Sequence, residues 1–286
     1  MFHKTPKKVG LALGGGAAKG LAHIGVIRTL EKAGIDISFI SGTSMGALVG
    51  GYYAATKDIN FIENFFIKMK HSDVYPVTRI LRKRDGSIFK NELMELLEGE
   101  IRGKKIEDCE IPFAAVATDV ETGDEVVLKT GDLREAIKAS TALPLIFPPV
   151  NIGGRVLMDG GFVNPVPADV VRGMGAEYVI AVDVSSKWFN FEEEKMNPMK
   201  IYSVMPKALS MIEYQIARRI LPQADIVLTP PVLGYKWFKF ADAEEIIKCG
   251  ASEAKNKLRT IFTGSHRVPP PRTTLDKFLD FIFYQD

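Results

Sequence analysis

The chain of 286 residues has few cysteines, little excess of charge of either sign and no long, purely apolar run. Its two cysteines, Cys109 and Cys249, lie far apart and match no paired metal-ligand spacing. The 37 basic and 35 acidic residues leave a net charge of +2, which creates no global field for steering onto nucleic acid. These features argue against a disulfide scaffold, a cysteine-based metal site and nucleic-acid binding, and they fit a reducing compartment.

The longest window without a charged residue, 37–56, is too polar for a membrane span. Its 20 residues include four glycines, three serines and two threonines. The first apolar run, 9–13, leads directly into three glycines without a cleavage site, unlike a signal peptide. We therefore expect a cytoplasmic chain, with any membrane contact peripheral and at the inner face of the membrane.

Short apolar runs alternate with helical spacing along the chain, which predicts an α/β fold with a largely parallel central sheet. Strands are predicted at residues 9–13, 37–40, 112–117, 125–128, 155–158, 178–182 and 226–228. Helices are predicted at residues 19–33, 47–55, 60–69, 90–98, 133–139, 166–172, 206–220 and 241–262. This interleaving predicts one domain over residues 1–264, followed by a proline-rich linker and amphipathic tail over 265–286.

The pentapeptide Gly42-Thr-Ser-Met-Gly46 fits the G-x-S-x-G pattern of a nucleophile elbow. In that element a serine occupies a strained turn between a strand and a helix, and the flanking glycines give the turn room. The pattern also arises by chance, but here a predicted strand precedes it and a helix of small residues follows it. Ser44 is therefore a candidate nucleophile, and a plain turn is the alternative.

A second glycine-rich turn, Gly14-Gly-Gly-Ala-Ala-Lys-Gly20, joins the first predicted strand to the first predicted helix. Backbone N–H groups in such a turn can bind an anion. A dinucleotide site is disfavoured because Lys19 replaces the third glycine and Asp36 precedes the second strand instead of ending it. A Walker loop is excluded by the residues on either side of Lys19. The remaining functional interpretation is an oxyanion hole, and a turn without a ligand is the alternative.

A catalytic serine needs a base, and the histidines are poorly placed to supply it. The four are His3, His23, His71 and His266. Only His266 has the chain position expected in a Ser–acid–His order, but it lies beyond the last core helix and before a proline run. Asp159 is the better candidate, because Asp159-Gly-Gly161 follows a predicted strand and would present a carboxylate at the strand end.

Taken together, these motifs resemble those of the bacterial patatin-like phospholipases, a family of serine acyl hydrolases with a Ser–Asp dyad. A fourth motif, Ala139-Ser-Thr-Ala-Leu-Pro144, lies between the elbow and the acid, and the resemblance extends over residues 9–254. It implies a three-layer α/β/α fold with Ser44 as nucleophile and Asp159 as base. By the same resemblance, the oxyanion hole is supplied by Gly14, Gly15 and Gly16.

The resemblance implies hydrolysis of a phospholipid or another fatty-acyl ester through an acyl-enzyme, with neither a metal nor an organic cofactor. A non-catalytic lipid-binding or regulatory protein on the same fold is the alternative.

Residues 59–69 carry more apolar side chains than one core-facing stripe requires, with Phe61 and Phe65 among the excess. We expect this helix either to lie at a membrane surface or to pack on the protein or on a second subunit. The tail shows a similar excess.

Overall fold

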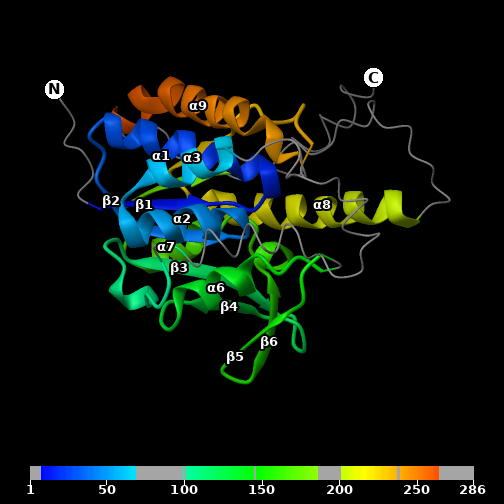
Figure 1. The fold of residues 1–286 in the computed structure, drawn as a ribbon. Helices are drawn as coiled ribbons and strands as arrows, with labels where there is room; N and C mark the ends of the chain where they lie inside the picture. Colours follow the sequence, from blue (N-terminus) through cyan, green and yellow to red (C-terminus); the bar gives the residue numbers. More distant parts are fainter. Residues whose placement is uncertain are drawn as a thin grey trace.

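The computed structural model describes residues 8–68, 99, 101–144, 146–185, 201–236 and 239–263, with the backbone alone for 201–210. These residues form an eight-stranded sheet in the order β5-β6-β3-β2-β1-β7-β8, with β4 paired to β3 (Figure 1). The parallel strands are β1 (Val9–Leu13), β2 (Ile37–Thr43), β3 (Phe113–Asp119), β7 (Tyr178–Val182) and β8 (Ile226–Leu228). The antiparallel strands at one side are β4 (Glu125–Leu128), β5 (Val150–Ile152) and β6 (Arg155–Asp159).

Helices cover both faces of this sheet, which gives three layers. The helices of one face are α1 (Ala22–Lys32), α2 (Met45–Thr56), α3 (Ile59–Lys68), α6 (Leu133–Ser140) and α9 (Ala243–Thr263). The other face carries α7 (Ala168–Gly173) and α8 (Ile201–Ile220). Short 3-10 helices are η1 (Ala17–Leu21), η2 (Ile106–Asp108), η3 (Gly160–Phe162), η4 (Leu221–Gln223) and η5 (Phe240–Asp242). The predicted α/β class with a mostly parallel sheet is confirmed.

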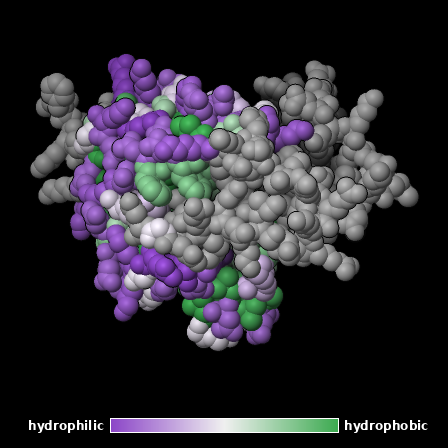
Figure 2. Space-filling view, viewed as in Figure 1, coloured by the Kyte–Doolittle hydropathy of each residue, from purple (hydrophilic) through white to green (hydrophobic). Residues whose placement is uncertain are grey.

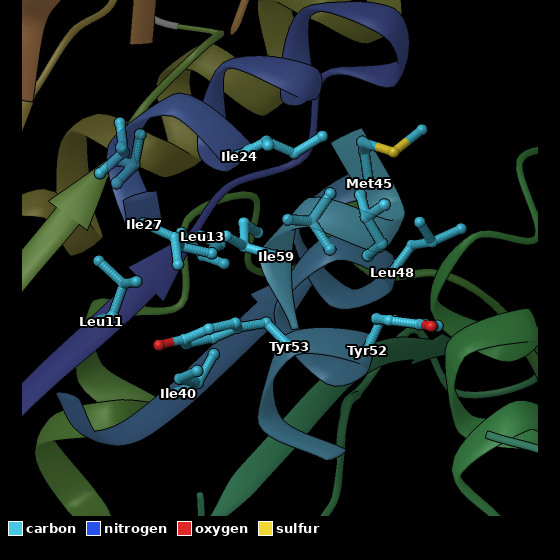
Figure 3. Close-up of a cluster of buried hydrophobic side chains, with 14 of the residues drawn as sticks. Leu11, Leu13, Ile24, Ile27, Ile40, Met45, Leu48, Tyr52, Tyr53 and Ile59 are labelled. Atoms are coloured by element: carbon cyan, nitrogen blue, oxygen red, sulfur yellow. The ribbon is translucent and has the colours of Figure 1, made fainter. Parts of the chain in front are cut away.

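Strand β1 shows how the sequence divides the core between the two faces. Leu11 and Leu13 point into the larger apolar cluster, where Figure 3 shows them near Ile24 and Ile27 of α1. Ala12 points to the opposite face and joins the smaller cluster. This alternation follows from the two-residue period of a strand, and burial on both faces explains why the whole strand is apolar.

Several boundaries differ from those expected. Strand β2 continues to Thr43 instead of ending at Ile40, because the polar side chains of Ser41 and Thr43 are buried and find acceptors of their own. Strand β5 was not predicted, because an exposed asparagine separates its two apolar residues, whereas the equally short β8 is apolar throughout. Helix α8 begins at Ile201, five residues before the predicted start at Pro206. The expected helix 90–98 and the tail lie outside the described residues.

The surplus apolar residues of α3 pack largely on the protein. The Phe61 ring stacks on the buried Tyr52 with 5.3 Å between centroids, and Phe65 meets Phe66 edge-on at the same separation. Both side chains are partly buried against the main core, and the exposed large apolar side chain of this helix is Ile67. Protein packing is therefore the better supported interpretation of the two phenylalanines.

The outer surface of the described residues is mostly hydrophilic on the face drawn in Figure 2, with apolar side chains gathered at its lower edge, near β5 and β6. None of the helices in the described part of the chain is long and apolar enough to cross a membrane.

Candidate active site

The sheet register brings Ser44 and Asp159 to the same place. Strand β2 ends at Thr43, which pairs with Val116, so the next residue, Ser44, lies level with Ala117 of β3. On the other side of β3, the antiparallel strand β6 ends at Asp159, which pairs with Ala117. The two candidate residues therefore flank one central strand, and the Ser44 side chain hydrogen-bonds the Asp159 carboxyl.

Ser44 has the backbone of a strained elbow. Its φ of 53° and ψ of −122° place a non-glycine residue at positive φ, immediately before α2 begins at Met45. The flanking glycines are required by close backbone contacts. A Cβ on Gly42 would lie 2.4 Å from the Gly46 carbonyl oxygen, and one on Gly46 would lie 2.1 Å from that of Leu13. These contacts explain why glycines stand two residues before and two residues after Ser44.

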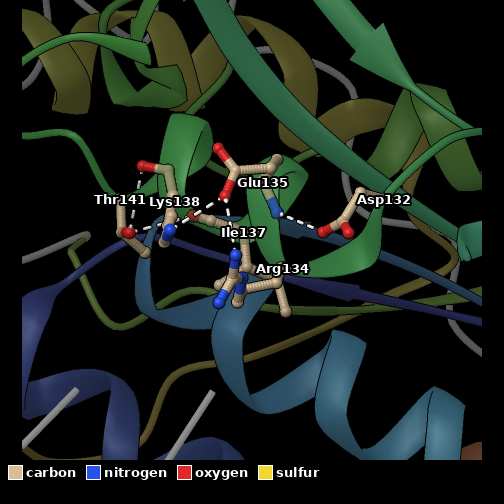
Figure 4. A network of polar contacts seen from close by, with 6 residues as sticks. All are labelled: Asp132, Arg134, Glu135, Ile137, Lys138 and Thr141. Carbon is tan, nitrogen blue, oxygen red and sulfur yellow. Dashed lines mark hydrogen bonds and ion pairs between the residues drawn. The ribbon is translucent and has the colours of Figure 1, made fainter. Parts of the chain in front are cut away.

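The elbow is tied to the central strand by a residue to which sequence analysis gave no role. The Ser44 N–H donates to Ser140 Oγ at 3.0 Å, and the Ser140 hydroxyl donates to the Val116 carbonyl at 2.5 Å. Ser140 is the last residue of α6, whose first turn is capped by Asp132 accepting from the Glu135 N–H at 2.9 Å (Figure 4). The available signal was the motif Ala139-Ser-Thr-Ala-Leu-Pro144, of which Ser140 is the second residue.

Asp159 is almost fully buried and held firmly. Its Oδ1 accepts from the Gly161 N–H at 2.8 Å, its own N–H donates to the Ala142 carbonyl at 3.1 Å, and its carbonyl accepts from Thr118 Oγ1 at 2.7 Å. Burial raises the pKa of this carboxyl to about 6, although the hydrogen bonds from Ser44 and Gly161 favour the charged form. A carboxylate with this pKa suits general-base work near neutral pH.

A second carboxyl, Glu213 of α8, lies beside the same turn. A methyl group placed on Gly161 would be 2.8 Å from Glu213 Oε1 and 3.2 Å from Asp159 Oδ1. Burial raises the pKa of Glu213 to about 8, and the nearby charge of Asp159 adds to the shift. Sequence analysis missed Glu213, because a glutamate on an amphipathic helix is normally expected on its solvated face.

The three glycines expected to form the oxyanion hole are not equivalent. The Gly14 N–H donates to the Val182 carbonyl at 3.0 Å, and the Gly15 N–H donates to the Pro165 carbonyl at 2.9 Å. Within the described part of the chain, the Gly16 N–H has no acceptor. Two of these N–H groups thus anchor the loop, and the assignment of the oxyanion hole to Gly14, Gly15 and Gly16 stays a prediction.

The segment that follows the Asp159 turn anchors the elbow strand and the glycine loop together. Thr43 Oγ1 donates to the Asn164 carbonyl at 2.7 Å, and Ser41 Oγ donates to the Pro167 carbonyl at 2.7 Å. The carbonyl between them, that of Pro165, is the acceptor for the glycine loop. The segment 164–167 thus contacts both the strand that leads to the elbow and the glycine loop, whose relative position matters for acyl chemistry.

The remaining candidates are not part of this constellation. His3, His71 and His266 lie outside the described residues. His23 is fully buried on α1, where its Nε2 lies 2.7 Å from the Gly14 carbonyl oxygen. In the part of the chain that the structure describes, no group of three histidine, cysteine, aspartate or glutamate side chains could hold a metal ion.

Fold and site together define a three-layer α/β protein with a serine and a carboxylate in contact where β2 and β6 end, on either side of β3. Residues 11–172 match the family model of the patatin-like phospholipases, and the chain belongs to this family. The narrower expectations, a bacterial member and a working Ser–Asp dyad, stay predictions.

Two curated relatives and one solved structure show the extent of the likeness. A patatin-like phospholipase domain-containing protein of Caenorhabditis elegans is 30% identical over 301 residues, covering 91% of this chain and 21% of that protein. A lysophospholipase of Debaryomyces hansenii is 29% identical over 306 residues, covering 95% of this chain and 19% of that protein. The chain thus spans about a fifth of the length of each. The structure of VipD from Legionella pneumophila matches with a TM-score of 0.51 at 13% identity, covers 90% of this chain and 67% of that one, and supports the fold alone.

Proposed function

We propose that this protein is a lipid acyl hydrolase that cleaves carboxylic esters through a Ser44–Asp159 dyad. The observation that carries the proposal is the hydrogen bond between the Ser44 side chain and a buried carboxyl whose pKa is about 6. Such a carboxylate can accept the serine proton directly, so the mechanism needs no histidine.

In the first half-reaction, Ser44 Oγ attacks the acyl carbonyl while its proton passes to Asp159. The negative charge that develops on the carbonyl oxygen is stabilised by the Gly16 N–H and by the N-terminus of α2, whose first N–H groups have no partners within the helix. Asp159 then returns the proton to the departing alcohol, which leaves an acyl-enzyme on Ser44. In the second half-reaction, Asp159 takes a proton from water as the resulting hydroxide attacks the acyl carbon. The bond between that carbon and Ser44 Oγ then breaks, which releases the fatty acid, and Asp159 returns the proton to Ser44.

The proposed substrate class is a phospholipid, lysophospholipid or other fatty-acyl ester. Family membership and the printed name of the Debaryomyces hansenii relative support it. We further propose that the protein acts in the cytoplasm and meets its substrate by peripheral contact with the inner face of the membrane, where such lipids reside. The two free cysteines are consistent with a reducing compartment.

Labelling with a fluorophosphonate and hydrolysis of lysophosphatidylcholine test the proposal together. The wild-type chain should be labelled and active, and Ser44→Ala should be neither. Ser38→Ala, at the other end of the same strand, is the matched control and should behave like wild type. A folded Ser44→Ala variant that keeps wild-type hydrolysis would contradict the proposal, and labelling at Ser44 without hydrolysis of any acyl ester would favour the non-catalytic lipid-binding alternative.

A further inference from the structure

His23 is a fully buried titratable side chain that the mechanism above does not use. It lies in the first turn of α1, and its Nε2 is 2.7 Å from the carbonyl oxygen of Gly14. Among the described residues, its other ring nitrogen, Nδ1, has no hydrogen-bond partner. Burial lowers the pKa of His23 to about 4, so the ring is neutral at physiological pH. Because a carbonyl only accepts, we assign the proton to Nε2, which donates to Gly14.

This hydrogen bond completes the attachment of the glycine loop. The Gly14 N–H is held by the Val182 carbonyl, the Gly14 carbonyl by His23, and the next N–H, that of Gly15, by the Pro165 carbonyl. The Gly14–Gly15 peptide group is thereby held at both its carbonyl and its N–H, and the peptide group before it is held at its N–H. The next N–H along the chain is that of Gly16, for which the described residues offer no acceptor.

The same carbonyl also lies close to the elbow. A Cβ on Gly46 would approach the Gly14 oxygen to 2.8 Å, so this oxygen is confined between the start of α2 and the His23 ring. A rotation of the Gly14–Gly15 peptide would break the His23 bond and move the loop relative to Ser44. The histidine is therefore placed to control the geometry between donor and nucleophile.

Packing alone does not account for a histidine at this position. The surrounding core is apolar, and an aliphatic side chain would fill space there without burying an unpaired ring nitrogen, which costs stability. A histidine supplies a neutral N–H donor, at Nε2, that reaches the Gly14 carbonyl oxygen. We propose that His23 is a positioning residue of the oxyanion loop: its Nε2–H fixes the Gly14 carbonyl and so aims the Gly16 N–H at the developing oxyanion. The inference rests on the proposed function of Ser44 and Asp159.

Two amide substitutions of different reach test this role. In His23→Gln the side-chain amide nitrogen can take the place of Nε2, whereas in His23→Asn the same group is too short to reach Gly14. With a soluble short-chain ester, we expect His23→Gln to keep kcat within about threefold of wild type. His23→Asn and the apolar His23→Leu should lower kcat by roughly 10- to 100-fold with little change in KM, the scale expected when a catalytic group is misplaced by up to 1 Å.

Thermal unfolding of each variant separates positioning from stability. A folded His23→Asn or His23→Leu variant with wild-type kcat would overturn the proposal, as would a folded His23→Gln variant as slow as His23→Leu. Failure of both Asn and Leu variants to fold would show that the bond serves the fold rather than the loop, which also overturns it. Ser44→Ala, assayed in parallel, keeps the two questions apart: if it is active, the proposed function fails, whatever the His23 variants do.

Discussion

The Ser140 hydroxyl lies between the Ser44 N–H, from which it accepts a hydrogen bond, and the Val116 carbonyl, to which it donates one. The Ser44 N–H sits in a turn with a φ of 53°, where neither the end of β2 nor the start of α2 offers it an acceptor. Ser140 thus joins the strained elbow to β3, the strand that separates Ser44 from Asp159. The geometry of the proposed Ser44–Asp159 dyad therefore also depends on Ser140, which is not part of the dyad.

Ser140→Ala should therefore slow the reaction and weaken the fold. Loss of the hydroxyl leaves the elbow N–H without a partner, which costs about 1–3 kcal/mol of unfolding free energy. We expect kcat to fall by about tenfold or more, because the nucleophile is no longer fixed. Steady-state kinetics and urea unfolding measure both effects. Thr141→Ala is the matched control, since the bonds of its hydroxyl to the described residues go to carbonyls of α6. Equal kinetic losses in the two variants would contradict the assigned role of Ser140.

The pKa of Asp159 predicts an acid limb in the rate profile. Because burial raises this pKa to about 6, the base becomes protonated as the pH falls through that value. We expect kcat/KM to decrease about tenfold for each pH unit below pH 6, with the dependence of a single group. Initial rates on a soluble ester between pH 4 and pH 8 measure the profile. An inflection near 4, the ordinary value for aspartate, would show that Asp159 is not the titrating base.

The same shift predicts that Asp159→Asn stabilises the protein at neutral pH. Between 3.8 and about 6, folded Asp159 keeps a proton that the unfolded chain releases, so the free energy of unfolding falls as pH rises through this window. Replacing the ionised carboxylate by a neutral amide, which still accepts from the Gly161 N–H, should recover on the order of 1–3 kcal/mol at pH 7. Thermal unfolding at pH 7 tests the sign, and a lower Tm for the variant contradicts the account.

Glu213 should govern the alkaline side of the rate profile. With a pKa of about 8, it keeps its proton at neutral pH while Asp159 is ionised. Its ionisation adds a second negative charge beside Asp159, in a site that must also stabilise a developing oxyanion, so kcat/KM should fall above pH 8. Glu213→Gln keeps the neutral form and should lose this alkaline limb while retaining the acid limb near pH 6. An alkaline limb that persists in Glu213→Gln assigns it to another group.

The parts of the site that could be predicted from sequence are those encoded over a few residues. One such part is the pair of glycines two residues before and after Ser44, where close backbone contacts leave no room for a Cβ. Another is the glycine turn that directly follows Asp159. The fold class could also be predicted, because buried parallel strands are apolar throughout and β1 shows that pattern.

The missing parts depend on contacts between distant segments. Ser140 acts on an elbow 96 residues earlier, and Glu213 reaches Asp159 only because α8 packs over the η3 turn. Which glycine N–H groups stay free is decided by acceptors in two other segments, Val182 and Pro165. No local pattern contains this information, so the sequence could indicate a glycine loop but not which of its donors remains available.

The central claim is that Ser44 and Asp159 act as one catalytic unit, and a double-mutant cycle tests it most directly. The rate of hydrolysis of a soluble acyl ester is measured for wild type, Ser44→Ala, Asp159→Asn and the double variant, with folding checked for each by thermal unfolding. The account predicts that each single change removes nearly all catalysis and that the double variant is no slower than the slower single variant. A double variant that loses the product of the two separate factors would show independent residues and contradict the dyad.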